Sequence, residues 1–387
     1  MKILIVGTDL NSIILAQYIK LQNKEHDIYL TSEYTDVTQF YTPINIQETD
    51  IQSICDFVKY NQIEFTIVTS SLSIINGIAD IFKKEGFPIF APFAEAARIT
   101  YFNSIAKKIM YKLKINTPKF GIFDRENLAT DYIRRSKFPI VIENDFTLLY
   151  RENNIYDTFS KAKLGLQKIF ENNNEKIVIE NYIDSTPLYL YFITDGYNAL
   201  PLISIERNSG AKYSSTIAPC EKISGDMRVN ILQKAIYPIL DDIIKYAGGY
   251  TGIIGLKLKL ANENFYILEF YNGFQHYDLQ TFLSILNEDF FELIYDATNG
   301  CLADKHDYIK LNENFAYTIA IDKDELIDTE DTNEFIETSD SNKKIYTNTA
   351  STINYSRENL IEYIETIAKD SLIKRIKASE EKRIVKI

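Results

Sequence analysis

The 387-residue sequence contains no tryptophan, only three histidines and only three cysteines. Cys55, Cys220 and Cys301 are far apart and odd in number, which argues against a disulfide framework or a zinc site. Reduced thiols of this kind are typical of a cytoplasmic protein. Three histidines also argue against a multi-histidine metal centre.

Long apolar runs are absent as well. No stretch of eighteen or more apolar residues occurs, so the sequence predicts no membrane-spanning helix. The first residues, MKILIVGTD, lack the long apolar region and the small-residue cleavage site of a signal peptide. The formal net charge of −12 argues against a general nucleic-acid-binding role. The remaining composition, 45% hydrophobic and 25% charged, is that of a soluble globular chain with room for about two to three domains.

The stretch Tyr250–Gln280 carries the clearest local pattern. Gly255–Leu260 alternates apolar residues with lysine, and Phe265–Phe270 is a run of large apolar side chains around one acid. The polar segment Ala261–Asn264 between them has the length of a hairpin turn. We therefore expect two antiparallel strands here.

Glu269 lies inside the second of these strands, between Leu268 and Phe270. Burying an isolated carboxylate there costs several kcal/mol unless it meets a cation, a metal or a donor. One interpretation is an acid that forms a salt bridge with Lys257 or Lys259. The other is a carboxylate that holds a divalent ion over a nucleotide. The local pattern leaves both open.

The first hundred residues alternate short apolar strands with helical patterns, which predicts a doubly wound parallel sheet with its ligand edge at the strand C-termini. The turn after the first strand, GTDLNS, has the single glycine Gly7 and therefore indicates a phosphate site only weakly. The predicted strands are Lys2–Val6, His26–Leu30, Phe65–Val68 and Ile89–Phe90, and the predicted helices are Asn11–Leu21, Ile51–Tyr60 and Ile74–Glu85.

Later segments predict a hairpin over Glu143–Asn154, one long helix over Met227–Ala247 and an acidic linker over Asp322–Asp340. A strand over Tyr346–Ile353 and an amphipathic helix over Arg357–Ala368 follow. These elements predict further α/β units after the parallel sheet.

Five stretches, in order and at matching spacing, make the sequence resemble the phosphoribosylamine–glycine ligase family of the ATP-grasp superfamily. They are Thr66–Pro92, Ala94–Phe120, Phe138–Glu143, Lys176–Gly196 and Tyr250–Phe270. The resemblance implies an N-terminal doubly wound (pre-ATP-grasp) domain, a central ATP-grasp α+β domain with a lid subdomain, and a small C-terminal α/β domain. The implied domains span 1–100, 101–310 (with the lid at about 118–186) and 311–387.

The family's reaction, as the resemblance implies it, uses ATP and magnesium to phosphorylate the glycine carboxylate before an amine displaces phosphate. It needs a cation on the phosphates, a glycine-rich lid and two metal ligands. Where the family has a lysine after its PIVVK strand, this sequence has Glu143. The lid segment Phe146–Arg151 has no glycine, and Arg151 is a displaced substitute for its lysine. The family's metal-binding Glu-Phe-Asn is Glu269-Phe270-Tyr271 here, so a phenol stands where an amide ligand belongs.

Other motif positions are also replaced. Asp9–Ser12 stands at the family's Gly-Gly-Arg-Glu-His, Thr69–Ser71 at its Gly-Pro-Glu and Phe102-Asn103 at its Ser-Lys. The glycine-rich substrate loop is shortened to Asn208–Pro219. Three motif residues survive: Glu180, which matches a family position near the adenosine, Lys107 and Glu269.

Because fold positions match while ligase positions are replaced, we expect a degenerate, non-catalytic relative with a binding, regulatory or scaffolding role. The alternative is an active but divergent ATP-dependent carboxylate–amine ligase that makes glycinamide ribonucleotide or a related amide. In either case the expected partners are a nucleotide or purine-pathway small molecule and possible protein partners, with no nucleic acid and no membrane. The candidate nucleotide-binding residues are Glu180, Lys107, Arg151 and Lys212, and Glu269 is the candidate metal ligand.

Two further residue groups have both a catalytic and a structural interpretation. His276 and Asp278 are spaced like a catalytic dyad, although two polar residues on a turn are more often solvated. Cys220 beside Pro219 is a candidate nucleophile, although an inert thiol is the more common outcome.

Overall fold

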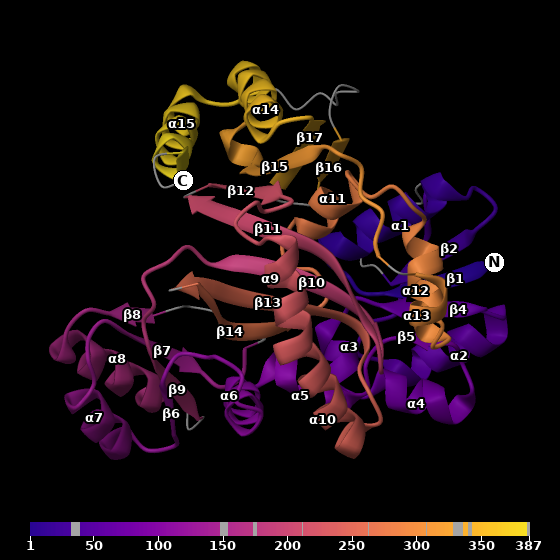
Figure 1. Cartoon of the computed structure of the whole chain (residues 1–387). Helices are drawn as coiled ribbons and strands as arrows, with labels where there is room; N and C mark the ends of the chain where they lie inside the picture. The colour runs from indigo at the N-terminus through magenta and orange to yellow at the C-terminus, as the bar shows by residue number, and fades with distance from the viewer. Residues whose placement is uncertain are drawn as a thin grey trace.

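The computed structural model describes residues 1–31, 39–147, 154–172, 176–210, 212–261, 263–306, 308–327, 336–339 and 343–384 (Figure 1). None of the helices in these ranges is both long enough and apolar enough to cross a membrane. The described chain folds into three sheets with helices packed against them.

The N-terminal sheet has the strands β1 (Lys2–Val6), β2 (Asp27–Thr31), β3 (Thr42–Ile44), β4 (Phe65–Val68) and β5 (Ile89–Phe90). All its pairs are parallel, in the order β3-β2-β1-β4-β5, which confirms the doubly wound prediction. Asp9 caps the first helix by accepting from the Ser12 amide at 3.0 Å. The helices are α1 (Leu10–Gln22), α2 (Ile51–Asn61), α3 (Ser71–Ile75) and α4 (Ile78–Glu85).

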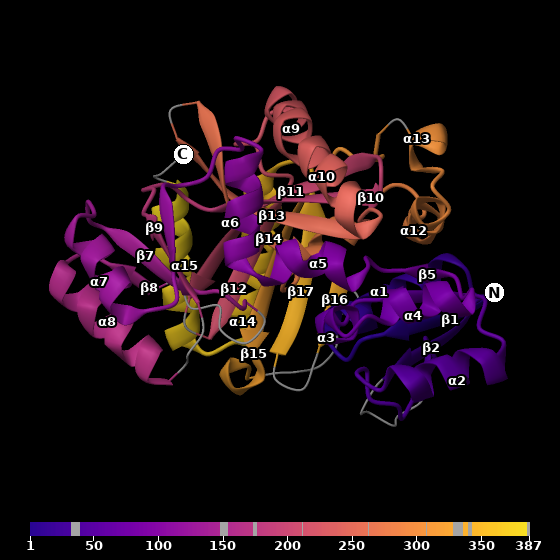
Figure 2. The ribbon, with the colours of Figure 1, turned by 90° about the horizontal axis from the view of Figure 1, so that it is seen from below.

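A four-stranded sheet follows two connecting helices, α5 (Ala94–Tyr101) and α6 (Asn103–Lys112). Its strands are β6 (Phe120–Phe123), β7 (Ile140–Asn144), β8 (Asn154–Tyr156) and β9 (Ile177–Asn181), in the order β6-β9-β7-β8. The helices α7 (Glu126–Arg134) and α8 (Phe159–Asn172) cover one face with an apolar cluster. In both views this unit lies at the opposite end of the molecule from the N-terminal sheet (Figures 1 and 2).

The largest sheet has eight strands: β10 (Leu188–Asp195), β11 (Ala199–Gly210), β12 (Tyr213–Ala218), β13 (Thr251–Ala261), β14 (Asn264–Asn272), β15 (Phe315–Asp322), β16 (Ile336–Ser339) and β17 (Lys343–Ala350). Their order is β14-β13-β10-β11-β12-β15-β17-β16, and every pair is antiparallel. The hairpin predicted around Ala261–Asn264 is confirmed by the β13–β14 pair. Of the acidic segment predicted as a linker, only 322–327 and 336–339 are described; they contribute the end of β15 and the strand β16, so the C-terminal strands extend the central sheet.

Helices pack on both faces of this sheet. The predicted helix Met227–Ala247 consists of α9 (Gly225–Ile231), a π turn (Leu232–Ile236) and α10 (Tyr237–Ala247). Pro238, near the start of α10, has no amide hydrogen, which explains the irregular turn before it. The other helices are α11 (Asp278–Leu283), α12 (Phe290–Thr298), α13 (Leu302–Lys305), α14 (Ile353–Ile367) and α15 (Asp370–Ile384).

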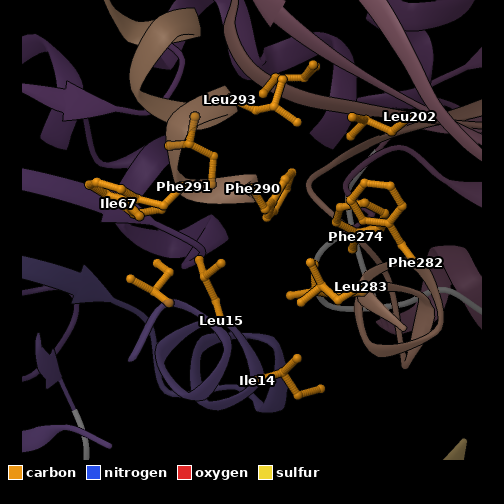
Figure 3. Packing of buried hydrophobic residues seen from close by; sticks show 14 of the residues in the cluster. Ile14, Leu15, Ile67, Leu202, Phe274, Phe282, Leu283, Phe290, Phe291 and Leu293 are labelled. Carbon is orange, nitrogen blue, oxygen red and sulfur yellow. The ribbon is translucent and has the colours of Figure 1, made fainter. Parts of the chain in front are cut away.

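One apolar cluster joins the N-terminal sheet to the central sheet. Leu15 of α1 and Ile67 of β4 face Phe282 of α11 and Phe290 of α12 (Figure 3). Phe282 and Phe290 contact edge to face, with ring centroids 5.3 Å apart. This shared core fixes the N-terminal sheet against the strands that carry the candidate site.

Candidate functional site

Five buried ionisable side chains gather between the four-stranded sheet and one edge of the eight-stranded sheet. Lys107 comes from α6, Glu143 from β7, Glu180 from β9, Lys257 from β13 and Glu269 from β14. Each is buried. The structure therefore brings together three of the predicted site residues, Lys107, Glu180 and Glu269. One further acid, Glu143, and one further base, Lys257, complete the cluster.

Lys107 and Glu180 form the most deeply buried pair of this cluster. The ammonium nitrogen lies 2.5 Å from the Glu180 carboxylate, with side-chain exposures of 0% and 3%. Lys107 also donates to the Thr117 hydroxyl at 3.0 Å. A cation held this way is already neutralised, so it offers little attraction to the phosphates of a nucleotide.

Glu269 is likewise committed to neighbouring side chains. It forms a buried ion pair with Lys257, and the Tyr271 hydroxyl donates to its other oxygen at 3.0 Å. Burial is the largest single effect on the pKa of Lys257 and lowers it, but the Glu269 charge and hydrogen bond, together with Tyr189 and Glu143, raise the pKa overall. The salt-bridge interpretation of Glu269 thus matches these contacts. A magnesium ion, which needs hard oxygen ligands in octahedral geometry, does not fit this donor set.

Glu143 occupies the position at which the resemblance places a lysine. Burial, followed by the charges of Glu269 and Glu180, raises its pKa to about 8, although Lys257 and Lys107 act in the opposite direction. Asn103 donates to its Oε2 at 3.3 Å. At neutral pH most of this carboxyl is therefore protonated. The cluster then holds two carboxylates and two ammonium groups and is close to neutral.

A cleft of about 190 Å³ adjoins this cluster. The segment that follows β9 forms one wall, and Leu268 lines another part. Lys259 donates to the Ile183 carbonyl at 2.6 Å and lies 4.2 Å from the centre of the Tyr182 ring. Burial and the nearby Lys257 charge lower the pKa of Lys259. This arrangement leaves a partly apolar cleft whose nearest cations already have partners.

One predicted nucleotide-binding residue lies outside this cluster, and another is not among the described residues. Arg151 lies outside the described residues. Lys212 lies on the β11–β12 hairpin and is exposed; its ammonium pairs with Asp324 at 2.8 Å and with Asp322 at 3.6 Å. Lys212 therefore faces the C-terminal strands rather than Glu180 or Glu269.

A second buried network surrounds Asp278, which the sequence suggested as one half of a dyad with His276. Asp278 is 0% exposed and accepts from the Tyr191 hydroxyl at 2.6 Å and from Arg207 Nε at 3.0 Å. The Arg207 guanidinium stacks 3.6 Å from the centre of the Tyr189 ring. His276 is exposed. Ion pairing thus accounts for the buried Asp278, and only the one cation on β11, Arg207, could have signalled it in the sequence.

The thiol of Cys220 is 3% exposed, and burial raises its pKa to about 11. Burial gives Cys55 a pKa of about 11 as well. Thiolates are the reactive species, so both groups are expected to be inert, whereas Cys301 is only half-buried.

Titration of the native protein with a disulfide reagent at pH 8 is therefore expected to modify Cys301 first. Cys55 and Cys220 should react at least about 100-fold more slowly than Cys301. At three pH units below its pKa, only about one thiol in a thousand is ionised. In urea all three should react alike. Cys301→Ser is the matched control, and rapid modification of that variant in its native state would contradict the expectation.

The comparisons with known proteins first define a class. The ATP-grasp (A) domain of phosphoribosylglycinamide synthetase matches residues 103–278, and its N domain matches residues 1–100. The crystal structure of phosphoribosylamine–glycine ligase from Thermotoga maritima has a TM-score of 0.77 at 16% identity, covering 96% of this chain and 98% of that one. A biotin carboxylase from Campylobacter jejuni, solved with β,γ-ATP, has a TM-score of 0.72 at 14% identity, covering 95% and 91%. The chain therefore has the ATP-grasp fold.

Since the two domain matches together span more than half of the residues, the chain belongs to the phosphoribosylglycinamide synthetase family. It is 27% identical over 316 residues to the phosphoribosylamine–glycine ligase of Caldanaerobacter subterraneus subsp. tengcongensis, which covers 78% of this chain and 76% of the relative. It is 26% identical over 315 residues to the enzyme of Fusobacterium nucleatum, covering 77% and 74%. The resemblance found in the sequence is confirmed, and so is the predicted fold class.

Proposed function

We propose that this chain is a non-catalytic member of its family that retains a binding or regulatory role. One observation carries the proposal: Lys107 and Lys257, the two cations of the buried cluster beside the cleft, are each paired with a buried carboxylate of the chain. At an effective dielectric constant of about 20, unit charges 4 Å apart interact by roughly 4 kcal/mol. Two internally neutral pairs offer a polyphosphate only a fraction of that attraction.

Glu143 supports the same conclusion. Its position calls for a cation in a ligase, yet its carboxyl is neutral at neutral pH and turns anionic as the pH rises through about 8. An approaching phosphate would meet either no charge or a like charge. The partly apolar cleft beside it suits a nucleoside-like or other purine-pathway small molecule better than a magnesium–triphosphate complex. A protein partner is the other candidate.

One observation favours an active, divergent carboxylate–amine ligase instead. Lys107, Glu180 and Glu269 hold the motif positions of the family and lie in one cluster. A rearrangement that separates Lys257 from Glu269 would leave the Glu269 carboxylate able to bind a metal ion and the Lys257 ammonium able to bind a phosphate. This second function requires two buried ion pairs to open when the substrates bind.

Calorimetric titration with ATP, with and without magnesium, separates the two functions. We expect no magnesium-dependent heat, and phosphate release with glycine and phosphoribosylamine at the rate without protein. Glu269→Ala should leave that background unchanged. The Caldanaerobacter relative, run under the same conditions, is the positive control. A low-micromolar, magnesium-dependent Kd, or turnover that Glu269→Ala abolishes, would establish the ligase function instead.

A further inference from the structure

A cavity of about 220 Å³ lies away from this cleft, between the segment after β12 and the first turn of α14. Ile217, Pro219 and Phe315 give it apolar walls, and Arg357 and Asn354 of α14 line it at one end. Pockets for drug-sized ligands measure about 300–1,000 Å³, so this cavity has the size for a smaller molecule.

The cavity and the nucleotide cleft lie on opposite faces of the eight-stranded sheet. In the strand register, Tyr189 of β10 lies opposite Lys257 of β13, and Lys257 lies opposite Glu269 of β14. Residues directly opposite one another project from the same face of a sheet, so these three side chains share one face. Glu206, a lining residue of the cavity, pairs with Leu188, the neighbour of Tyr189 along β10. Because successive side chains of a strand point to opposite faces, Glu206 projects away from the Glu269 cluster.

Arg357 is the unusual feature of this cavity. It is only 7% exposed, and the one hydrogen bond it forms with the described residues runs from Nη2 to Asn354 Oδ1 at 3.0 Å. Within the described part of the chain it forms no ion pair with a carboxylate. A guanidinium has five donors and remains charged, and a buried charge without a counter-ion is costly. The remaining donors of Arg357 therefore call for an anion.

The backbone next to Arg357 favours the same charge. Helix α14 begins at Ile353, and its cap Thr352 accepts from the Tyr355 amide at 3.2 Å. The earlier amides of the first turn, those of Ile353 and Asn354, have no acceptor within the helix and adjoin the cavity. The positive end of the helix dipole lies there too.

Neither acid of the lining, Glu206 or Glu221, forms an ion pair with Arg357 in the described part of the chain. Glu206 pairs with Lys222 at 2.9 Å, so these two residues neutralise each other. Apart from this pair and the exposed Glu221, the walls away from α14 are apolar, which disfavours a ligand that is charged throughout. A fitting ligand has one anionic group at the Arg357 end and a hydrocarbon body at the other.

We propose that this cavity binds a small monocarboxylate with an apolar body. The carboxylate receives hydrogen bonds from Arg357 and from the first turn of α14, and a planar guanidinium suits a carboxylate because both of its oxygens can be engaged. The body packs against Ile217, Pro219 and Phe315. Such a ligand would join the segment after β12 to the C-terminal helices, on the sheet face opposite the nucleotide cleft.

The experiment uses the full chain and three probes: 4-methylpentanoate, its uncharged amide and inorganic phosphate. We expect the acid to raise Tm and to bind in calorimetry, and we expect the amide and phosphate to bind at least tenfold more weakly. Equal affinities for the acid and the amide would contradict the requirement for an anionic group. A higher affinity for phosphate than for the acid would contradict the requirement for an apolar body. Absence of binding by all three would overturn it entirely.

Arg357→Gln is expected to weaken binding of the acid at least tenfold. Because it removes an unpaired buried charge, the unliganded variant should be as stable as the parent or more so. Arg375→Gln removes an arginine of α15 that is exposed and paired with Glu325, and it should bind the acid normally. Ile217→Phe fills the apolar end and should also abolish binding, which provides an independent test. An unchanged affinity in Arg357→Gln or Ile217→Phe would contradict the assigned site.

Discussion

Replacing Lys107 with methionine is expected to lower the free energy of unfolding by about 3–5 kcal/mol at neutral pH, because it leaves a buried carboxylate without its cation. Lys107 is fully buried, and its partner Glu180 is 3% exposed. Glu143 lies in the same cluster and would lose one of the two cations that lower its pKa, so two acids respond to one substitution. Methionine keeps the volume of the side chain and removes only the charge.

Urea unfolding measures this loss, and two further variants identify its origin. Lys108→Met changes the adjacent, exposed lysine and should alter stability by less than about 0.5 kcal/mol. Lys107→Met combined with Glu180→Gln removes both charges of the pair and should recover most of the loss, as replaced buried pairs commonly do. If the double variant is as unstable as Lys107→Met alone, packing rather than the unpaired charge determines the effect.

Local patterns in the sequence were sufficient for most strands of the N-terminal sheet and for the β13–β14 hairpin, but not for β3 or β16. The alternation of strand and helix predicted the parallel sheet, and the run around Glu269 predicted the β13–β14 hairpin. Burial of Lys107 and its contact with Glu180 depend on the packing of α6 against β9, which no local pattern encodes. Lys257 was one of two lysines considered for Glu269, and only the strand register, which pairs the two residues, selects it.

Two places where sequence reasoning fell short share one physical cause, the order of the eight strands. Lys212 is near Glu180 in the implied site, but the β11–β12 hairpin carries it toward Asp322 and Asp324. The order also makes the C-terminal strands part of the central sheet, and α14 packs on the face they extend. Arg357 therefore becomes buried, although in the sequence it reads as an ordinary residue at the start of an amphipathic helix.

Glu143→Gln is expected to make the protein more stable at alkaline pH and to flatten the pH dependence of its stability. The folded-state pKa of Glu143 is about 8, above its ordinary value of 4.5. Between pH 4.5 and pH 8 the folded protein therefore keeps a proton on Glu143 that the unfolded chain has already released. Stability therefore falls as the pH rises through this window and levels off above it. Glutamine keeps the shape and cannot ionise. The free energy of unfolding of Glu143→Gln should exceed that of the parent only slightly near pH 5 and by about 3–5 kcal/mol at pH 9.

Urea unfolding at pH 5, 7 and 9 tests this, with Glu362→Gln, an exposed acid of α14, as the matched control whose difference from the parent stays nearly constant. If Glu143→Gln raises the free energy of unfolding equally at pH 5 and pH 9, packing rather than ionisation determines the effect.

The same variant also tests the function of the site. If the site binds a polyphosphate, ATP should bind more tightly to Glu143→Gln than to the parent above pH 8, where only the parent carries the extra negative charge. Because Lys107 and Lys257 are already paired in both proteins, we expect no magnesium-dependent ATP binding by either. Removing the one misplaced acid is then insufficient to restore a ligase site, since the surviving cations remain neutralised by the chain itself.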